Sequence, residues 1–203
     1  VELLPQPAER PLTVLLHGSQ GALAGGQLGA GISALAATAE AGRELRVYVT
    51  EGRPYMDGAR LAAWELRQAG LEHRLVPDSA VAWLLAREPI DAVLIAAEWV
   101  AANGDTGALV GSRSLALLAT ATLATPESRA RVVVHGPSVL RDPGTTDAAA
   151  IPTELRPARE LTAYLRDVPV RMSDALVPAA DVIPAGAIDV LVTERGTEAP
   201  EGD

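Results

Sequence analysis

The sequence reads LTVLLHGSQG at residues 12–21, an apolar run that ends in His17 and a turn with two glycines. A continuous apolar run is typical of a strand buried on both faces of a sheet, whereas a half-exposed strand alternates apolar and polar residues. A longer stretch of helical composition, Gly21–Ala41, follows the turn. A buried strand, a short turn and a helix make the first half of a βαβ unit, so this region predicts a parallel sheet.

The same alternation of short apolar runs and longer helical stretches continues along the chain. Further strands are predicted at Arg46–Thr50, His73–Val76, Ala92–Ala96, Arg131–His135 and Asp189–Thr193. Further helices are predicted at Gly58–Ala69, Asp78–Arg87 and Val110–Leu123, with Asp78 or Ser79 as the N-cap of the second of these. The pattern indicates the α/β class, with a Rossmann-like, open and mostly parallel sheet that carries helices on both faces.

Length and composition favour one compact unit. The chain has 203 residues, of which 48% are hydrophobic, which is enough for one substantial core. We expect residues 1–203 to form a single domain, ordered from about residue 10 to residue 196, with a tail that lacks structure from Gly196 onward.

The charged residues exclude several kinds of chemistry. The net charge is −9, which disfavours bulk binding to nucleic acid or to an acidic membrane. The sequence has no cysteine, and all 17 basic residues are arginines. A thiolate nucleophile, a disulfide framework, a Schiff-base lysine and a Walker-type phosphate lysine are therefore excluded. A bound phosphate must be held by arginines, hydroxyl groups or backbone N–H groups.

We expect a cytoplasmic protein without a metal or cofactor. No apolar run is long enough to cross a bilayer, and Val1–Arg10 lacks the basic-then-apolar pattern of a leader. The chain starts at Val1 and not at Met, which is consistent with removal of an upstream segment. The three histidines, His17, His73 and His135, are far apart and lack the spacing of a zinc site.

The topology of such a sheet predicts where a ligand binds. In open parallel sheets, ligands bind beyond the carboxyl ends of the strands, where the strand order reverses. The segments that follow the predicted strands are residues 17–21, 51–58, 78–79, 98–105 and 135–138. His17 and His135 both follow predicted strands, which would allow the two side chains to meet at the site.

Motifs in these same segments resemble a known family. The sequence reads VYVTEGRP at residues 47–54 and DGARL at 57–61, followed by Asp78-Ser79, AANGD at 101–105, IPTELRP at 151–157 and the IP and TERG segments near the end. In this order, over about Leu12 to Gly196, they are similar to the C-terminal domain of the methylthioribose-1-phosphate isomerase and initiation factor 2B (alpha, beta and delta subunit) family.

The resemblance also shows departures at the positions that carry the family's chemistry. Active isomerases have a catalytic cysteine in an HCNAGALA loop, whereas residues 17–24 read HGSQGALA and place Gly18 at that position. The family's catalytic aspartate is replaced by Glu98, and its Asn-Lys pair by Ala108-Leu109. The family's helical N-terminal domain is not contained in this sequence. Because an acid–base group contributes about 10²–10⁴-fold to a rate, these changes predict loss of the usual isomerisation.

The resemblance therefore implies a diverged protein that binds a sugar phosphate or a nucleotide, in a regulatory or specialised biosynthetic role. It implies ligand contacts from Ser19, Gly21, Arg53, Asn103 and Asp105, and a homodimer. The alternative is an active aldose–ketose isomerase, an intramolecular oxidoreductase, acting on a ribose-1-phosphate-type substrate. In that alternative Glu98 and His17 are the catalytic acid and base.

Other interpretations of the same residues stay open. The strand-turn-helix around Ser19 resembles a serine-hydrolase nucleophile elbow, although His17 stands where that motif requires glycine. Arg53 could be a surface ion pair, Glu98 could cap a turn, and residues 103–105 read as ordinary turn chemistry.

Overall fold

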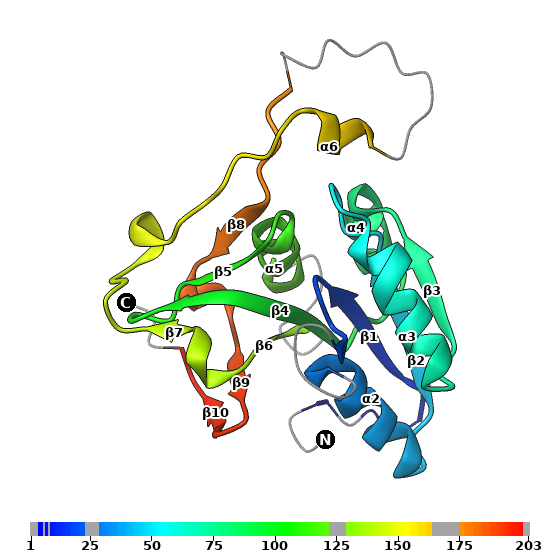
Figure 1. Ribbon diagram of the computed structural model, residues 1–203. Helices are drawn as coiled ribbons and strands as arrows, with labels where there is room; N and C mark the ends of the chain where they lie inside the picture. The colour runs from blue at the N-terminus through cyan, green and yellow to red at the C-terminus, as the bar shows by residue number, and fades with distance from the viewer. Residues whose placement is uncertain are drawn as a thin grey trace.

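The computed structural model describes residues 4–5, 7, 9–22, 29–121, 129–163 and 175–200. These residues form one mixed β-sheet with flanking helices (Figure 1). The strands are β1 (Leu12–His17), β2 (Leu45–Thr50), β3 (His73–Val76), β4 (Ala92–Ala101), β5 (Thr106–Leu109), β6 (Arg131–His135), β7 (Arg141–Asp142), β8 (Ala180–Ile183), β9 (Val190–Thr193) and β10 (Gly196–Glu198).

The helices lie mainly between consecutive strands. The α-helices are α2 (Ala30–Glu40), α3 (Ala63–Gln68), α4 (Val81–Leu85), α5 (Ser112–Thr120) and α6 (Arg159–Thr162). A π-helical turn, Gly58–Ala62, leads directly into α3, and a 3-10 turn, Asp78–Ala80, leads into α4.

The central sheet is parallel and doubly wound. Its strand order is β10-β9-β6-β4-β1-β2-β3. The neighbours from β9 to β3 are parallel to one another, while β10, β5 and β8 pair in antiparallel fashion at the side. The chain moves outward from β1 through β2 to β3, and then returns to the other side of β1 with β4. The order therefore reverses between β1 and β4, where ligands bind in this class of sheet.

Hydrophobic clusters on both faces of the sheet confirm the predicted layers. One cluster joins Leu15 of β1 to apolar residues of α4 and α5. The other joins Leu12, Val14 and Leu16 of the same strand to residues of α2 and α3. Because successive side chains of a strand point to opposite faces, a strand covered on both sides must be apolar throughout. This requirement explains the apolar run from which the fold was predicted.

Most strands match their predicted ranges. The bounds of β1, β3 and β6 are as predicted, and β2 and β9 differ by one residue. The helical stretch Gly21–Ala41 contains α2, but residues 23–28 lie outside the described residues, as do residues 122–123 of the stretch Val110–Leu123.

Three predictions near strand ends are wrong. Strand β4 does not stop at Ala96 but continues to Ala101, because its second half pairs with β5 and β7. The tail does not lose structure at Gly196, because Gly196–Glu198 pairs with β9 as strand β10. The Asp78 side chain does not cap its own helix. It accepts hydrogen bonds from the backbone N–H groups of Gly52 at 2.9 Å and Arg53 at 2.7 Å, and so holds the loop after β2.

The described residues were also searched for membrane-spanning segments. Among them, none of the helices combines the length and the apolar character that crossing a bilayer requires.

Candidate functional site

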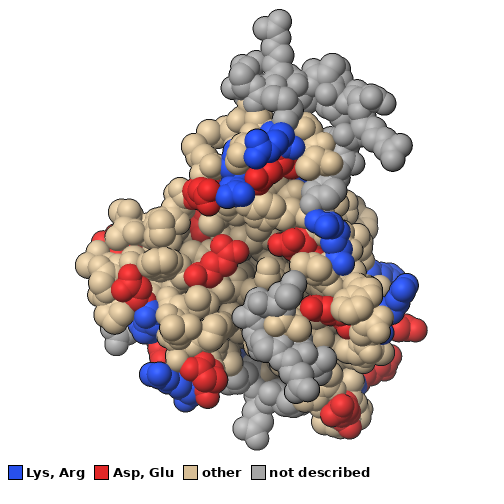
Figure 2. Space-filling view, in the orientation of Figure 1, with Lys and Arg blue, Asp and Glu red and all other residues tan. Residues whose placement is uncertain are grey.

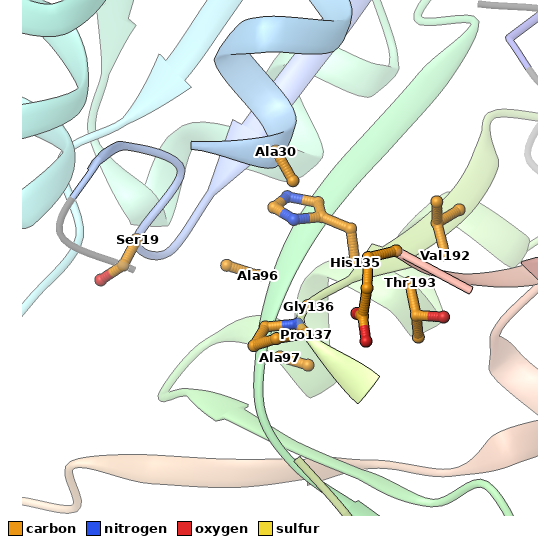
Figure 3. A pocket seen from close by; sticks show the side chains of 10 residues that line it. Ser19, Ala30, Ala96, Ala97, His135, Gly136, Pro137, Val192 and Thr193 are labelled. Carbon is orange, nitrogen blue, oxygen red and sulfur yellow. The ribbon is translucent and has the colours of Figure 1, made fainter. Parts of the chain in front are cut away.

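The candidate site lies beyond the carboxyl ends of β1 and β4. A cavity of about 450 Å³ opens there, and Figure 3 shows the side chains that line it. Its lining residues come from the ends of four strands and the start of α2: Ser19, Ala30, Ala96, Ala97, His135, Gly136, Pro137, Val192, Thr193 and Glu194. Ser19 also borders a second hollow of about 180 Å³ on its other side. The structure thus places Ser19 at the reversal point, between two recesses.

The turn after β1 requires glycine at its first position. Gly18 has φ +82°, a conformation that residues with a side chain rarely adopt. A Cβ atom at this position would lie 3.6 Å from the Cβ atom of Ala96, so the position faces the end of β4. Gly18 stands at the family's cysteine position, and its location next to β4 shows how close a side chain there would come to that strand.

Gly21 is covered by a carboxylate and does not face open space. Glu65 of α3 accepts a hydrogen bond from the backbone N–H of Ala22 at 3.0 Å. A Cβ atom on Gly21 would come within 1.3 Å of Glu65 Oε2. In this conformation an acidic side chain of the protein occupies the space in front of Gly21, and contact between Gly21 and a ligand stays a prediction.

Glu98 lies on β4 at an irregularity of the strand. The pairing with β5 shifts between Ala97 and Trp99, so Glu98 is the extra residue of a bulge. Bulges next to functional sites redirect a side chain. The Glu98 side chain is exposed, yet the surrounding protein raises the pKa of its carboxyl group by desolvation, and the nearby Asp57 carboxylate raises this pKa further. The pKa of Asp57 is also raised by burial, although Arg60 opposes the shift.

Asp57 is a candidate residue that sequence reasoning did not assign to the site. It lines the hollow that also contains Gly18 and Ser19. A carboxylate that raises the pKa of a neighbouring carboxyl group, as Asp57 does for Glu98, is a common arrangement in acid–base sites. The motif match at residues 57–61 was the available signal, because Asp57 stands where the isomerases usually have glutamine.

Arg53 carries a guanidinium group that forms no ion pair with any described carboxylate. Its Nη2 donates a hydrogen bond to the backbone oxygen of Leu161 in α6. Its backbone is fixed by Asp78, as described above. The alternative of a surface ion pair at a strand end is therefore wrong among the described residues, and the side chain retains donors for an anion.

The predicted catalytic residue His17 does not reach the Glu98 side of the site. It is 2% exposed, and its Nδ1 lies 2.8 Å from Thr50 Oγ1. Its side chain shares the face of Leu15, under α4 and α5, and lines a separate cavity with Asp78. Burial lowers the pKa of His17, although the carboxylates of Asp78 and Asp181 oppose the shift. The cavity that His17 lines does not have Glu98 in its lining, so this geometry does not support pairing the two, and the catalytic role of His17 stays a prediction.

His135 lies on the opposite face of the sheet from His17, so the two rings do not meet. It occupies the same face as Val133, which belongs to the cluster under α2 and α3. Gln20 connects the two strands instead: its Oε1 lies 2.7 Å from His135 Nε2, and its Nε2 donates to the backbone oxygen of His17 at 2.6 Å. His135 lines the main cavity, so it joins the candidate site while His17 leaves it.

Asn103 and Asp105 lie at the far end of β4 and fasten loops together. The Asp105 carboxylate accepts hydrogen bonds from the backbone N–H groups of Ala148 and Ala185, both at 2.8 Å. It also accepts one from Asn103 Nδ2 at 3.0 Å, while Asn103 Oδ1 accepts from the Asp105 N–H. In this structure their side-chain polar atoms are paired within the turn and with neighbouring loops, as the turn interpretation expects. Their role as ligand contacts stays a prediction.

The hydrolase alternative for Ser19 receives no support from the geometry. Ser19 forms no hydrogen bond with any described histidine, and Met56 is the only described residue other than glycine with a positive φ. A nucleophile elbow would require a strained serine paired with a base. The described residues also contain no cluster of three or more His, Asp or Glu side chains that could hold a metal ion.

Comparison with known proteins agrees with this fold. A family model described as the initiation factor 2 subunit family matches residues 9–200. The chain is 40% identical over 188 residues to a probable bifunctional methylthioribose-1-phosphate isomerase/methylthioribulose-1-phosphate dehydratase of Nocardia farcinica, covering 92% of this chain and 33% of that protein. It is 37% identical over 190 residues to a methylthioribose-1-phosphate isomerase of Thermotoga neapolitana, covering 93% and 53%.

Solved structures give the same assignment. A 5-methylthioribose 1-phosphate isomerase from Pyrococcus horikoshii has a TM-score of 0.83 at 30% identity, covering 98% of this chain and 53% of that chain. The delta subunit of translation initiation factor eIF-2B from A. fulgidus has a TM-score of 0.81 at 26% identity, covering 93% and 53%. This chain therefore spans between a third and about half of the length of these relatives. The match over residues 9–200, with isomerases among the relatives, shows that the chain is an isomerase-like member of the initiation factor 2 subunit family.

Proposed function

We propose that the chain binds a phosphorylated sugar in the crevice between the ends of β1 and β4, with Glu98 as the group that contacts the reactive end of the ligand. The interaction of Glu98 with Asp57, at a bulge in β4, is the observation that carries this proposal. A carboxylate that holds its proton more tightly can donate a hydrogen bond to a sugar oxygen or accept one, depending on pH. Relatives named for a phosphorylated ribose support the class of ligand.

Arg53 is the proposed anion contact. A guanidinium group offers planar paired donors that suit a phosphate, and this one has no carboxylate partner among the described residues. Figure 2 shows acidic and basic side chains interspersed on the face that it draws, and not one broad basic surface of the kind that binds polyanions. A hydrogen bond to a charged group contributes about 1.5–3 kcal/mol, so loss of Arg53 should weaken binding by about tenfold or more.

Isothermal calorimetry with methylthioribose-1-phosphate, ribose-1,5-bisphosphate and a panel of nucleotides tests the proposal. The wild-type chain and the variants Arg53→Gln and Glu98→Gln are compared, with Arg67→Gln, an exposed arginine of α3, as the matched control. We expect both site variants to bind the sugar phosphate more weakly and the control to bind as the wild type does. If the folded wild-type chain binds none of these compounds, the proposed ligand role is wrong. If it binds nucleotides alone, the ligand is a nucleotide and not a sugar phosphate.

Isomerisation is the second candidate function, because relatives that are similar over more than nine tenths of this chain are named as isomerases. An aldose–ketose isomerisation removes a proton from C2 of the sugar and delivers one to C1. A carboxylate with a raised pKa, such as Glu98, is a stronger base for the first step. We expect a coupled assay with methylthioribose-1-phosphate to show turnover that Glu98→Gln abolishes. If the wild-type chain shows no turnover in this assay, isomerisation is wrong and ligand binding remains as the proposed function.

We further propose that residues 1–203 form one domain and that the chain is a homodimer. The single domain is supported by the sheet that the two main hydrophobic clusters share. The homodimer is supported by exposed apolar side chains that association would cover, namely Trp64, Leu75 and Trp83. Light scattering that shows only a monomer would contradict the dimer.

A further inference from the structure

The cavity lined by His135 has the wrong polarity for a phosphate. Much of its lining is small and apolar, from Ala30, Ala96, Ala97, Pro137 and Val192. The only charged side chain among the described lining residues is Glu194, whose carboxylate accepts hydrogen bonds from both the backbone N–H and the hydroxyl of Ser138. A negatively charged group would be repelled here. At about 450 Å³ the cavity falls in the size range of small-molecule pockets, so an uncharged occupant fits better.

The hydrogen bonds of Gln20 determine which nitrogen of His135 carries a proton. The Gln20 amide nitrogen donates to two backbone oxygens, that of His17 at 2.6 Å and that of Leu94 at 3.2 Å. The reversed amide would place its oxygen against both carbonyl groups, so Oε1 must face His135. That oxygen accepts at 2.7 Å, which requires His135 Nε2 to bear the hydrogen. Nδ1 is then left with a lone pair.

The ring of His135 is held as a neutral acceptor. His135 is 7% exposed and Gln20 is 1% exposed, so the pair is almost completely enclosed. Burial lowers the pKa of His135 to about 4, and the ring is therefore uncharged at neutral pH. Nδ1 has no hydrogen-bond partner among the described residues and is not one of their buried unpaired atoms, so a ligand in the cavity can reach it. So weak a base does not suit proton abstraction, which leaves a binding contact as its role.

Helix α2 is shaped to permit this network. A Cβ atom on Gly31 would lie 2.1 Å from Gln20 Oε1 and 3.1 Å from His135 Nε2. Only glycine allows the helix to approach the pair so closely. In Figure 3 the ring of His135 lies beside Ala30, at the start of α2. The helix, the amide and the imidazole thus form one packed unit at the wall of the cavity.

We propose that this cavity is a subsite for an uncharged, mainly apolar part of the ligand, which donates one O–H or N–H hydrogen bond to His135 Nδ1. The inference rests on the proposed function in one respect: the phosphate of the same ligand would bind beside this cavity, toward Arg53. His135 would then be a specificity contact that favours ligands with such a donor.

Imidazole ¹⁵N spectra of the full chain test the assignment directly. In the free protein we expect the His135 resonances of a ring protonated at Nε2 and bare at Nδ1. Addition of methylthioribose-1-phosphate should shift the Nδ1 resonance, and the uncharged sugar methylthioribose should shift it at higher concentration. Observation of the opposite tautomer in the free protein would overturn the inference.

Calorimetry separates this subsite from the phosphate contact. His135→Phe retains a flat ring without an acceptor and should weaken binding of methylthioribose-1-phosphate about tenfold, as expected for one hydrogen bond that contributes about 1.4 kcal/mol. Ala30→Leu should narrow the cavity and weaken the same ligand. Neither variant should change binding of inorganic phosphate. His73→Phe, a histidine on β3, is the matched control and should behave as the wild type.

The outcomes distinguish the two proposals. If methylthioribose-1-phosphate binds but neither shifts Nδ1 nor responds to His135→Phe, the subsite is wrong and the proposed function stands. If methylthioribose alone shifts Nδ1 while no phosphorylated sugar binds, the subsite stands and the proposed function is wrong. If neither sugar has an effect on the folded chain, both are wrong.

Discussion

Glu65 Oε2 lies where a side chain on Gly21 would have to be, within 1.3 Å of the position of a Cβ atom. The partner oxygen, Oε1, accepts a hydrogen bond from Ala22 N–H at 3.0 Å, while Oε2 itself is buried without a partner among the described residues. The turn after β1 contains Ser19 and Gly21, for which the resemblance implies ligand contacts. In this structure an acidic side chain from α3 already holds the backbone N–H group of Ala22, next to Gly21.

Removal of the Glu65 charge should therefore open the turn to anions. In Glu65→Gln the repulsion of a phosphate by the carboxylate is lost, and we expect inorganic phosphate to bind about tenfold more tightly. Calorimetry measures the change. Glu72→Gln, an exposed residue after α3, serves as the control. Equal phosphate affinity in wild type and Glu65→Gln would show that the turn does not bind anions.

The raised pKa of Glu98 predicts a dependence of stability on pH. A carboxyl group whose pKa is higher in the folded state contributes stability at low pH, and this contribution is lost as pH rises through the folded pKa. As pH rises, Glu98 loses its proton in a partly desolvated position beside the Asp57 carboxylate, and both features disfavour the ionised form. We therefore expect Glu98→Gln to have an equal or higher Tm than the wild type at pH 7.5 and no such gain at pH 4. Thermal unfolding at both values tests this.

The control for that experiment is Glu44→Gln, which alters an exposed carboxylate before β2. It should leave Tm unchanged at both pH values. If the substitution Glu98→Gln lowers Tm, relative to the wild type, by more at pH 7.5 than at pH 4, the result would contradict repulsion between Glu98 and Asp57.

His135 should produce the opposite pH dependence. Because burial lowers its folded pKa to about 4, the unfolded chain takes up a proton between its ordinary value of 6.5 and about 4, while the native chain does not. Stability is therefore present above pH 6.5 and is lost as pH falls through this window, by at most about 3 kcal/mol. We expect urea unfolding at several pH values to show this loss of stability in the wild type. The free energy of unfolding of His135→Phe should depend less on pH. An equal pH dependence in the two proteins would mean that the ring is not shielded from water.

Asp105 should matter for stability and not for ligand affinity. Burial alone would raise its pKa, but the hydrogen bonds from Asn103, Ala185 and Ala148 outweigh burial and lower it. Truncation in Asp105→Ala leaves these donors without an acceptor, so we expect unfolding to become easier by about 2–4 kcal/mol. The affinity of the folded variant for methylthioribose-1-phosphate should be unchanged. A selective loss of affinity would support Asp105 as a ligand contact.

The apolar pattern determined the central layers of the fold. Strands β1, β3 and β6 have their predicted bounds, and the helices follow them in the predicted order. A parallel strand covered on both faces has a continuous apolar run in its sequence, so the sequence alone was sufficient to predict these strands. The motif matches also placed Arg53 in the loop after β2, whereas Glu98 lies within β4 and not in a loop.

Pairings between distant segments decided the rest of the site. Extension of β4 to Ala101 depends on β5 and β7, which do not have the same apolar pattern, and it places Asn103 and Asp105 in the turn between β4 and β5. The face on which a strand-end residue lies decided the roles of the histidines: His17 follows Leu15 toward α4 and α5, and His135 follows Val133 toward α2. Sequence spacing specifies that successive residues of a strand alternate between the two faces of the sheet. Only the assembled sheet shows which helix covers each face and which side chain, such as that of Gln20, connects two strands.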